Sequence, residues 1–152
     1  MLTPELAAFV EGGQCIHIGT RDEHLEPTGG LVVAAIVDDD RTHVTAFIPK
    51  ADSREVLANL EANGQVALCF GRPVDDHACQ IKGVFVSARA ATRGERSTID
   101  AQWEQSLQQL EHISIPRVLW AGYALWPCVA VRIRVTAVFN QTPGPGAGAP
   151  LT

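Results

Sequence analysis

The sequence is poor in basic residues and has no basic block. It contains 12 Lys and Arg against 17 Asp and Glu, which gives a formal net charge of −5. The acidic residues gather at positions 38–40 and 75–76. This distribution would repel the phosphate backbone of a nucleic acid more than attract it. The composition therefore argues against nucleic acid as a partner.

The sequence also lacks the cysteine and histidine patterns of a disulfide or metal site. Its four cysteines are far apart, form no Cys-x-x-Cys pair and lie in apolar runs: Cys15, Cys69, Cys79 and Cys128. We interpret them as reduced thiols of the core. No two of the five histidines have the spacing of a metal-binding helix. We therefore expect no metal.

Neither a membrane span nor a secretory leader is visible. The N-terminus carries Glu5 and Glu11 where a leader would have a basic region and an unbroken apolar core. No segment approaches the roughly 20 apolar residues that cross a membrane. We expect a cytoplasmic protein with no membrane partner. The chain also lacks a nucleophile elbow and a phosphate-binding loop between strand and helix, which argues against a Ser-His-Asp hydrolase.

A series of short strands is present instead. A single domain of 152 residues buries about 70% of its unfolded surface. β-branched and apolar runs between turn-forming residues predict six strands, at about 14–20, 30–38, 42–49, 66–70, 78–92 and 128–139. The links between them are mostly short, which favours a small antiparallel barrel over a doubly wound sheet. Residues 1–140 would form this domain, and the Pro- and Gly-rich tail 141–152 would be extended or disordered.

Two of these strands carry further detail. Residues 31–37 are apolar at every position, which predicts a central strand covered on both faces. In the strand 78–92, the apolar positions shift by one residue after Gly83. A β-bulge at Gly83 would turn Val84 and Val86 inward and leave Gln80 and Lys82 outward.

Three helices are predicted around the barrel. The first begins at the N-cap Thr3 and is closed by a glycine pair. The second has Asp52 as N-cap, Glu55 completing a capping box, and Gly64 as a left-handed end. The third, at 97–110, has its apolar residues at helical spacing.

The order of elements in residues 53–86 resembles the flavin-binding split-barrel family that includes pyridoxamine 5′-phosphate oxidase. The matching features are a helix with a capped start, a buried strand, and a strand with a Gln-Ile-Lys-Gly run. The resemblance extends from about Glu5 to Phe139. It implies a mainly β fold, α+β by content, built as a six-stranded antiparallel split barrel with peripheral helices. It also implies FMN as cofactor and a homodimer whose flavin site is built from both chains.

The start of the second helix is the first candidate site, with Lys50, Ser53 and Arg54. Free backbone N–H groups, the positive end of the helix dipole, a hydroxyl and two cations could together bind a dianionic phosphate. The resembling family places its Ser-Arg-Lys phosphate contacts here. The same residues also fit an ordinary capped helix. Glu55 stands where the family often has a second cation, and residues 27–30 replace its strand-two arginine.

Gln80 and Lys82 are the second candidates. The Gln80 amide could donate to and accept from the flavin pyrimidine edge, and the Lys82 ammonium would stabilise charge on the reduced ring. A solvated strand face is the alternative. Trp126 resembles the position from which the family's partner chain supplies an aromatic contact, and it equally fits a core or interface anchor.

Three functions fit these observations. The first is an FMN-binding oxidoreductase that acts on an unidentified small-molecule substrate, with the redox step performed by the cofactor. The second is a protein that holds flavin, deazaflavin or haem without turnover. The third is a dimeric interaction protein with an empty groove. A homodimer is expected because Arg132, Arg134 and the aromatic residues of 120–126 are of the types found at interface cores.

Overall fold

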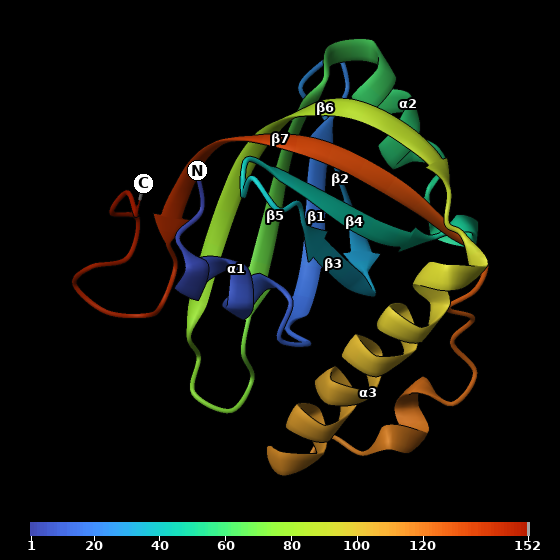
Figure 1. Cartoon of the computed structure of the whole chain (residues 1–152), viewed down its shortest axis with the longest axis vertical. Helices are drawn as coiled ribbons and strands as arrows, with labels where there is room; N and C mark the ends of the chain where they lie inside the picture. The colour runs from blue at the N-terminus through green and yellow to red at the C-terminus, as the bar shows by residue number, and fades with distance from the viewer. Residues whose placement is uncertain (152) are drawn as a thin grey trace.

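The computed structural model describes residues 1–151 and contains one seven-stranded antiparallel sheet that curls into a barrel (Figure 1). The strand order is β2-β1-β5-β6-β7-β4-β3. The strands are β1 (Cys15–Arg21), β2 (Pro27–Val32), β3 (Ala34–Val37), β4 (His43–Pro49), β5 (Gln65–Gly71), β6 (Ala78–Ala90) and β7 (Cys128–Asn140). The helices are α1 (Pro4–Val10), α2 (Arg54–Asn63) and α3 (Arg96–His112), with short 3-10 turns η1 (Lys50–Asp52), η2 (Arg93–Glu95) and η3 (Arg117–Trp120).

The antiparallel barrel with peripheral helices agrees with the sequence analysis, but it has seven strands rather than six. The segment predicted as one strand at 30–38 forms two, because the backbone turns at Val33. β2 pairs with β1, and β3 pairs with β4. These strands are the two edges of the sheet, so the prediction of a central strand was wrong. The segment is apolar throughout because Val32 faces the core inside the barrel and Val33 faces a second core outside it.

The two cores lie on opposite sides of the sheet. The larger one fills the barrel and includes Val10 of α1, Leu60 of α2 and Leu68 of β5. The smaller one lies between the sheet and α3 and includes Phe47 and Ile99. Figure 1 shows α3 outside the barrel, below β3 and β4.

The helices form nearly where they were expected. Thr3 Oγ1 accepts a hydrogen bond from Leu6 N at 3.2 Å and caps α1. Gly64, at φ 70°, ends α2 as predicted. The predicted cap of α2 was wrong: Ser53 holds the N-cap position and makes no capping hydrogen bond, while Asp52 belongs to η1.

The irregularity predicted at Gly83 exists, but its extra residue lies in the other strand. Lys82 pairs with Ala137 and Gly83 with Val135, so Thr136 of β7 is the bulged residue. Gly83 faces inward and keeps the alternation of β6 unbroken up to Phe85. Val84 and Val86 are 40% and 45% exposed, so the prediction that they turn inward was wrong.

The C-terminal tail folds back along the end of β7. Asn140 N donates to Ala149 O at 2.8 Å, and Leu151 N donates to Val138 O at 2.8 Å. The tail thus forms a closed loop, which the sequence analysis did not predict. Within residues 1–151, no helix has the length and apolar character that crossing a membrane requires.

We expect Gly83→Ala to lower the free energy of unfolding by about 1–3 kcal/mol, because a core position without free space penalises an added methyl group. A Cβ at Gly83 would lie 2.3 Å from Ile133 Cγ2 and 2.7 Å from Arg134 O. Denaturant unfolding measures the change. The matched control is Gly71→Ala, where a Cβ would meet nothing within 4 Å. Equal unfolding midpoints for the two variants would contradict this account of β6–β7 packing.

Candidate functional site

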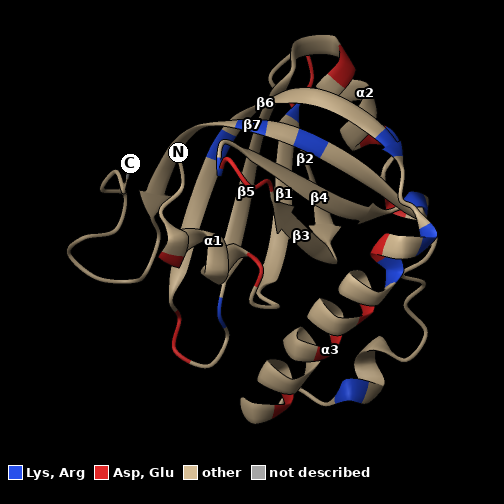
Figure 2. Ribbon diagram, viewed as in Figure 1, with Lys and Arg blue, Asp and Glu red and all other residues tan. Residues whose placement is uncertain are grey.

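A basic turn lies at the start of α2, where the chain leaves β4. Lys50 and Arg54 are exposed, and neither makes an ion pair with another of residues 1–151. Ser53 is 3% exposed, and its hydroxyl donates to Lys50 O at 3.0 Å. Two free cations and the first backbone N–H groups of α2 are thus available to an anion. In Figure 2, the acidic residues lie mainly on the helices and in the turns between strands.

An aromatic cluster supports this basic turn. Trp103 and Tyr123 stack with ring centroids 5.8 Å apart, and Trp120 packs edge-on against both. The Tyr123 hydroxyl donates to Asp52 Oδ2 at 2.7 Å. The cluster therefore holds η1, and with it the start of α2, against α3.

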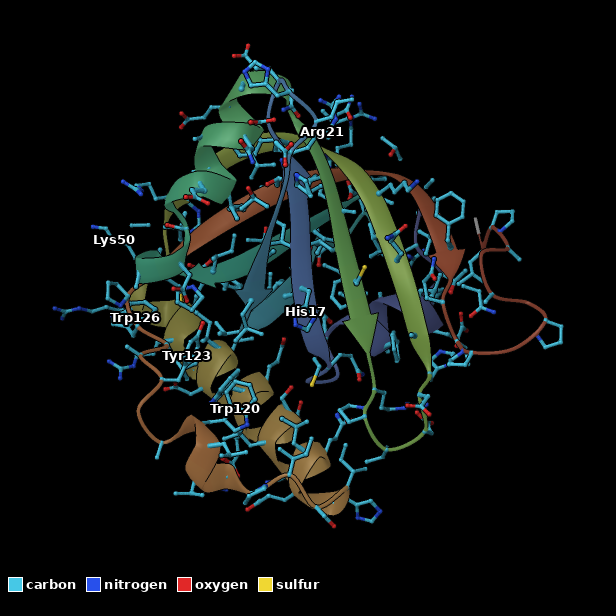
Figure 3. All side chains as sticks on the ribbon, turned by 180° about the vertical axis from the view of Figure 1, so that it is seen from behind. His17, Arg21, Lys50, Trp120, Tyr123 and Trp126 are labelled. Carbon is cyan, nitrogen blue, oxygen red and sulfur yellow. The ribbon has the colours of Figure 1, made fainter. Side chains whose placement is uncertain are left out.

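Trp126 lies beside the basic turn of its own chain. Lys50 N donates to the carbonyl oxygen of Pro127 at 2.8 Å. The guanidinium carbon of Arg96 lies 5.6 Å from the centroid of the Trp126 ring. Figure 3 shows Lys50, Trp126, Tyr123 and Trp120 along one side of the sheet face that carries His17. A single chain therefore brings Trp126 to Lys50 without help from a partner.

Gln80 and Lys82 point outward from β6, as predicted. Gln80 Nε2 lies 3.5 Å from Cys69 Sγ, to which it donates, and Lys82 Nζ lies 5.1 Å from the centroid of the Phe139 ring. His17 pairs with Cys69 across β1 and β5. His17, Cys69 and Gln80 therefore form a polar row across the outer face of the sheet, and Lys82 lies two residues further along β6.

The four cysteines differ in burial. Cys79 and Cys128 are buried, and burial raises the pKa of these thiols to about 12 and about 11. Cys15 is half-buried, and burial raises its pKa too. Cys69 is exposed, so the prediction that all four are core thiols was wrong for this residue. In β5 the inward positions are Val66, Leu68 and Phe70, which leaves Cys69 on the outer face.

The predicted phosphate and ring residues do not touch one another. Lys50 lies at the side of the outer face next to β2, and Lys82 lies on β6. Strands β2, β1 and β5 lie between them. Three strand spacings of about 4.8 Å make β2 and β6 about 14 Å apart. The two groups border one surface, and the residues of that surface were not singled out from the sequence.

One group of residues has the geometry of a metal site. Asp38, Asp40 and His43 each offer a ligand atom, all within 4.8 Å of one another. The group lies around the β3–β4 turn and was not found from histidine spacing. Arg132 already pairs with Asp38: its Nε and Nη2 both donate hydrogen bonds to Asp38 Oδ2. The arginine neutralises the carboxylate that a cation would need.

Comparisons with known proteins identify the fold. No family model matches the sequence, and a search of curated protein sequences finds no match. Among solved structures, HupZ from Group A Streptococcus is similar with a TM-score of 0.59 and 16% identity, covering 98% of this chain and 99% of HupZ. A candidate pyridoxamine 5′-phosphate oxidase from Lactobacillus delbrueckii has a TM-score of 0.57 and 14% identity, covering 91% and 93%. An FMN-binding protein from Syntrophomonas wolfei has a TM-score of 0.52 and 12% identity, covering 88% and 82%.

These similarities establish that the chain has the split-barrel fold of the pyridoxamine 5′-phosphate oxidase-like proteins. All three identities are below 25%, so the matches speak to the fold and not to the activity.

Tyr123 gives a direct test of the contact between the aromatic cluster and η1. Burial, and then its hydrogen bond to Asp52, raise the pKa of Tyr123 above the ordinary value of 10.0. The raised pKa of Tyr123 contributes to the free energy of unfolding. This contribution is fully present below about pH 10 and is lost as the pH rises toward the higher pKa of the native state. Because Tyr123 is the only tyrosine, tyrosinate absorbance against pH reports this group alone.

We expect the native protein to form tyrosinate at a higher pH than the urea-unfolded chain does. Asp52→Ala should move the native midpoint back toward the unfolded one, because it removes the carboxylate that opposes the phenolate. Identical midpoints in the native and unfolded protein would show that the contact does not form.

Proposed function

We propose that the protein binds FMN and uses it as a flavin-dependent oxidoreductase acting on a small molecule. The observation that carries the proposal is the basic turn, with its two free cations at a helix start, on a fold that an FMN-binding protein shares. A flavin phosphate is a dianion of the kind that such a helix start binds.

The residues present fit the phosphate of FMN. Lys50 and Arg54 would each provide a charge-assisted hydrogen bond, and the backbone N–H groups at the start of α2 would complete the grip. Ser53 acts in this arrangement by fixing the turn, since its hydroxyl already donates to Lys50 O. Glu55, in the first turn of α2, weakens the local positive field.

Gln80 and Lys82 would contact the ring. The amide of Gln80 can both donate and accept, which matches the polar edge of a flavin. Lys82 keeps a positive charge near the ring and would stabilise negative charge that develops on reduction. A bound flavin supplies the redox chemistry, so the chain itself needs only to bind, orient and shield. This explains why few residues of the sequence have catalytic character.

Two other functions use the same surface. A protein that holds flavin, deazaflavin or haem without turnover would need the same grip but no access for a substrate. An interaction protein would leave the surface free for a partner. Absorption spectra separate them, because flavin and haem give different visible bands and the third alternative gives none.

We further propose a homodimer. β6 exposes two valines close together, Val84 and Val86, which are 40% and 45% exposed. We call this pair the apolar strip. Exposed apolar side chains that lie close together are typical of an interface. A two-fold dimer would bury the strip on both chains and shield the adjoining ring residues from water.

For the phosphate grip, we expect Arg54→Ala to weaken FMN binding about ten- to a hundred-fold, the equivalent of about 1.5–3 kcal/mol for one charge-assisted contact. Riboflavin, which lacks the phosphate, should bind almost unchanged. Fluorescence titration with both ligands measures this. Arg72→Ala is the matched control, since it removes an equal charge at the β5–β6 turn. Equal losses of FMN and riboflavin affinity in Arg54→Ala would refute the phosphate assignment.

For the dimer, sedimentation at micromolar concentration should give about twice the chain mass of 16.3 kDa. Val86→Glu should shift the protein to the monomer, because it places a charge in the apolar strip. Val74→Glu is the control, as Val74 is similarly exposed at 42% but lies in the β5–β6 turn. A wild-type monomer, or a Val86→Glu dimer, would contradict the proposed interface.

A further inference from the structure

The first turn of α2 has no side-chain cap. Ser53 holds the N-cap position and makes no capping hydrogen bond, because its hydroxyl donates to Lys50 O at 3.0 Å. The first N–H group of the helix with a backbone acceptor is that of Leu57, which donates to Ser53 O at 2.9 Å. The N–H groups of residues 54–56 therefore have no acceptor among residues 1–151.

Asp52 is the residue that the local sequence favours for this cap. Asp is among the strongest N-cap residues, and Glu55 three residues further on would complete a capping box. In the structure the carboxylate is bonded elsewhere, since the Tyr123 hydroxyl donates to Asp52 Oδ2 at 2.7 Å. A contact between residues 71 positions apart thus overrides a local preference.

Two other aromatic rings anchor Tyr123. Its ring stacks on Trp103 of α3 and packs edge-on against Trp120, with centroid distances of 5.8 and 6.3 Å. Figure 3 shows Tyr123 on the same side of the sheet as Lys50. The Tyr123 hydroxyl is therefore a fixed donor beside η1. Asp52, by contrast, is an exposed side chain that can turn once this hydrogen bond is lost.

The direction of the Asp52 carboxylate decides the charge at the start of α2. In the cap position it would accept hydrogen bonds from the free N–H groups and place a negative charge beside Lys50 and Arg54. A phosphate needs the same N–H groups and the same positive end of the helix dipole. Leaving a helix uncapped costs stability, and a broken local rule of this kind is expected at functional sites.

We propose that Tyr123 is a positioning residue that keeps the phosphate site open by holding Asp52 away from the start of α2. The inference rests on the proposed flavin function, and it names the residue that sets the preference for a phosphorylated flavin. Lys50 and Arg54 attract the phosphate, and Tyr123 removes the competitor that the chain itself carries. Tyr123 acts through Asp52 and needs no contact with the ligand.

The test is Tyr123→Phe, which keeps the stacked ring and removes only the hydrogen-bond donor. Asp52 can then cap α2, so we expect FMN to bind about three- to thirtyfold more weakly, the range that corresponds to the strength of an N-cap. Riboflavin, which lacks the phosphate, should bind as it does to wild type. Fluorescence titration with both ligands measures the affinities.

Asp52→Ala separates this role from a simple bracing of η1. It breaks the same hydrogen bond as Tyr123→Phe but also removes the competing carboxylate, so FMN should bind at least as tightly as to wild type. The double variant, Tyr123→Phe with Asp52→Ala, should recover the wild-type affinity for FMN. If the double variant and Asp52→Ala both bind FMN as weakly as Tyr123→Phe does, the hydrogen bond only braces η1 and the proposal is overturned.

Amide hydrogen exchange without ligand gives a measurement that does not depend on flavin. In Tyr123→Phe, the N–H groups of Arg54 and Glu55 should exchange more slowly than in wild type, because the Asp52 carboxylate accepts hydrogen bonds from them. In the double variant they should exchange at the wild-type rate. Equal exchange rates in wild type and Tyr123→Phe would contradict the proposal.

The titrations also distinguish the failure of this inference from that of the proposed function. Unchanged FMN affinity in Tyr123→Phe, with a wild type that binds FMN, would overturn the positioning role and leave the flavin function standing. A wild-type protein that binds neither FMN nor riboflavin would remove the proposed function and the role of Tyr123 together.

Discussion

The corner at Val33 is the constraint on which the rest of the structure depends. β2 and β3 are consecutive in the chain but form opposite edges of the sheet, so the sheet has to curl until its edges meet. β3 is an edge strand, and a buried side chain forms hydrogen bonds with backbone groups on its free side. Gln102 of α3 accepts a hydrogen bond from Ala35 N at 2.9 Å and donates to Ala35 O at 2.8 Å. This amide seals an edge strand that would otherwise be free to pair with another chain.

The same constraint places the candidate site. Because the barrel closes through β2 and β3, the end of β4 and the outer face of β2, β1, β5 and β6 come to border one surface. Because α3 packs against β3, the aromatic cluster lies at the edge of this surface. There the Tyr123 hydroxyl donates a hydrogen bond to Asp52. The proposed phosphate residues and the proposed ring residues thus border one surface, although they come from separate segments of the chain.

Sequence patterns that act within a few residues predicted the helices and strands well. Contacts between residues far apart in the chain could not be predicted from the sequence. Gly64 and the apolar stripe of α3 act within a few residues, so their patterns could be interpreted directly. The corner at Val33 could not be predicted in this way. Val32 and Val33 face two different cores, and this gives the same continuous apolar run as a central strand. Cys69 was wrongly predicted to be buried because its inward neighbours in β5 and the outward Ala67 are apolar as well. The Tyr123–Asp52 contact joins residues 71 positions apart, so no local pattern could reveal it.

The central claim is that this split barrel carries a flavin, and the chromophore of the purified protein tests it most directly. The protein is purified without added cofactor, its visible spectrum is recorded, and the small molecule released on denaturation is identified by mass. The account predicts a flavin spectrum and release of FMN, about one per chain. A haem spectrum, or a colourless protein that takes up no flavin when FMN is added, would contradict it.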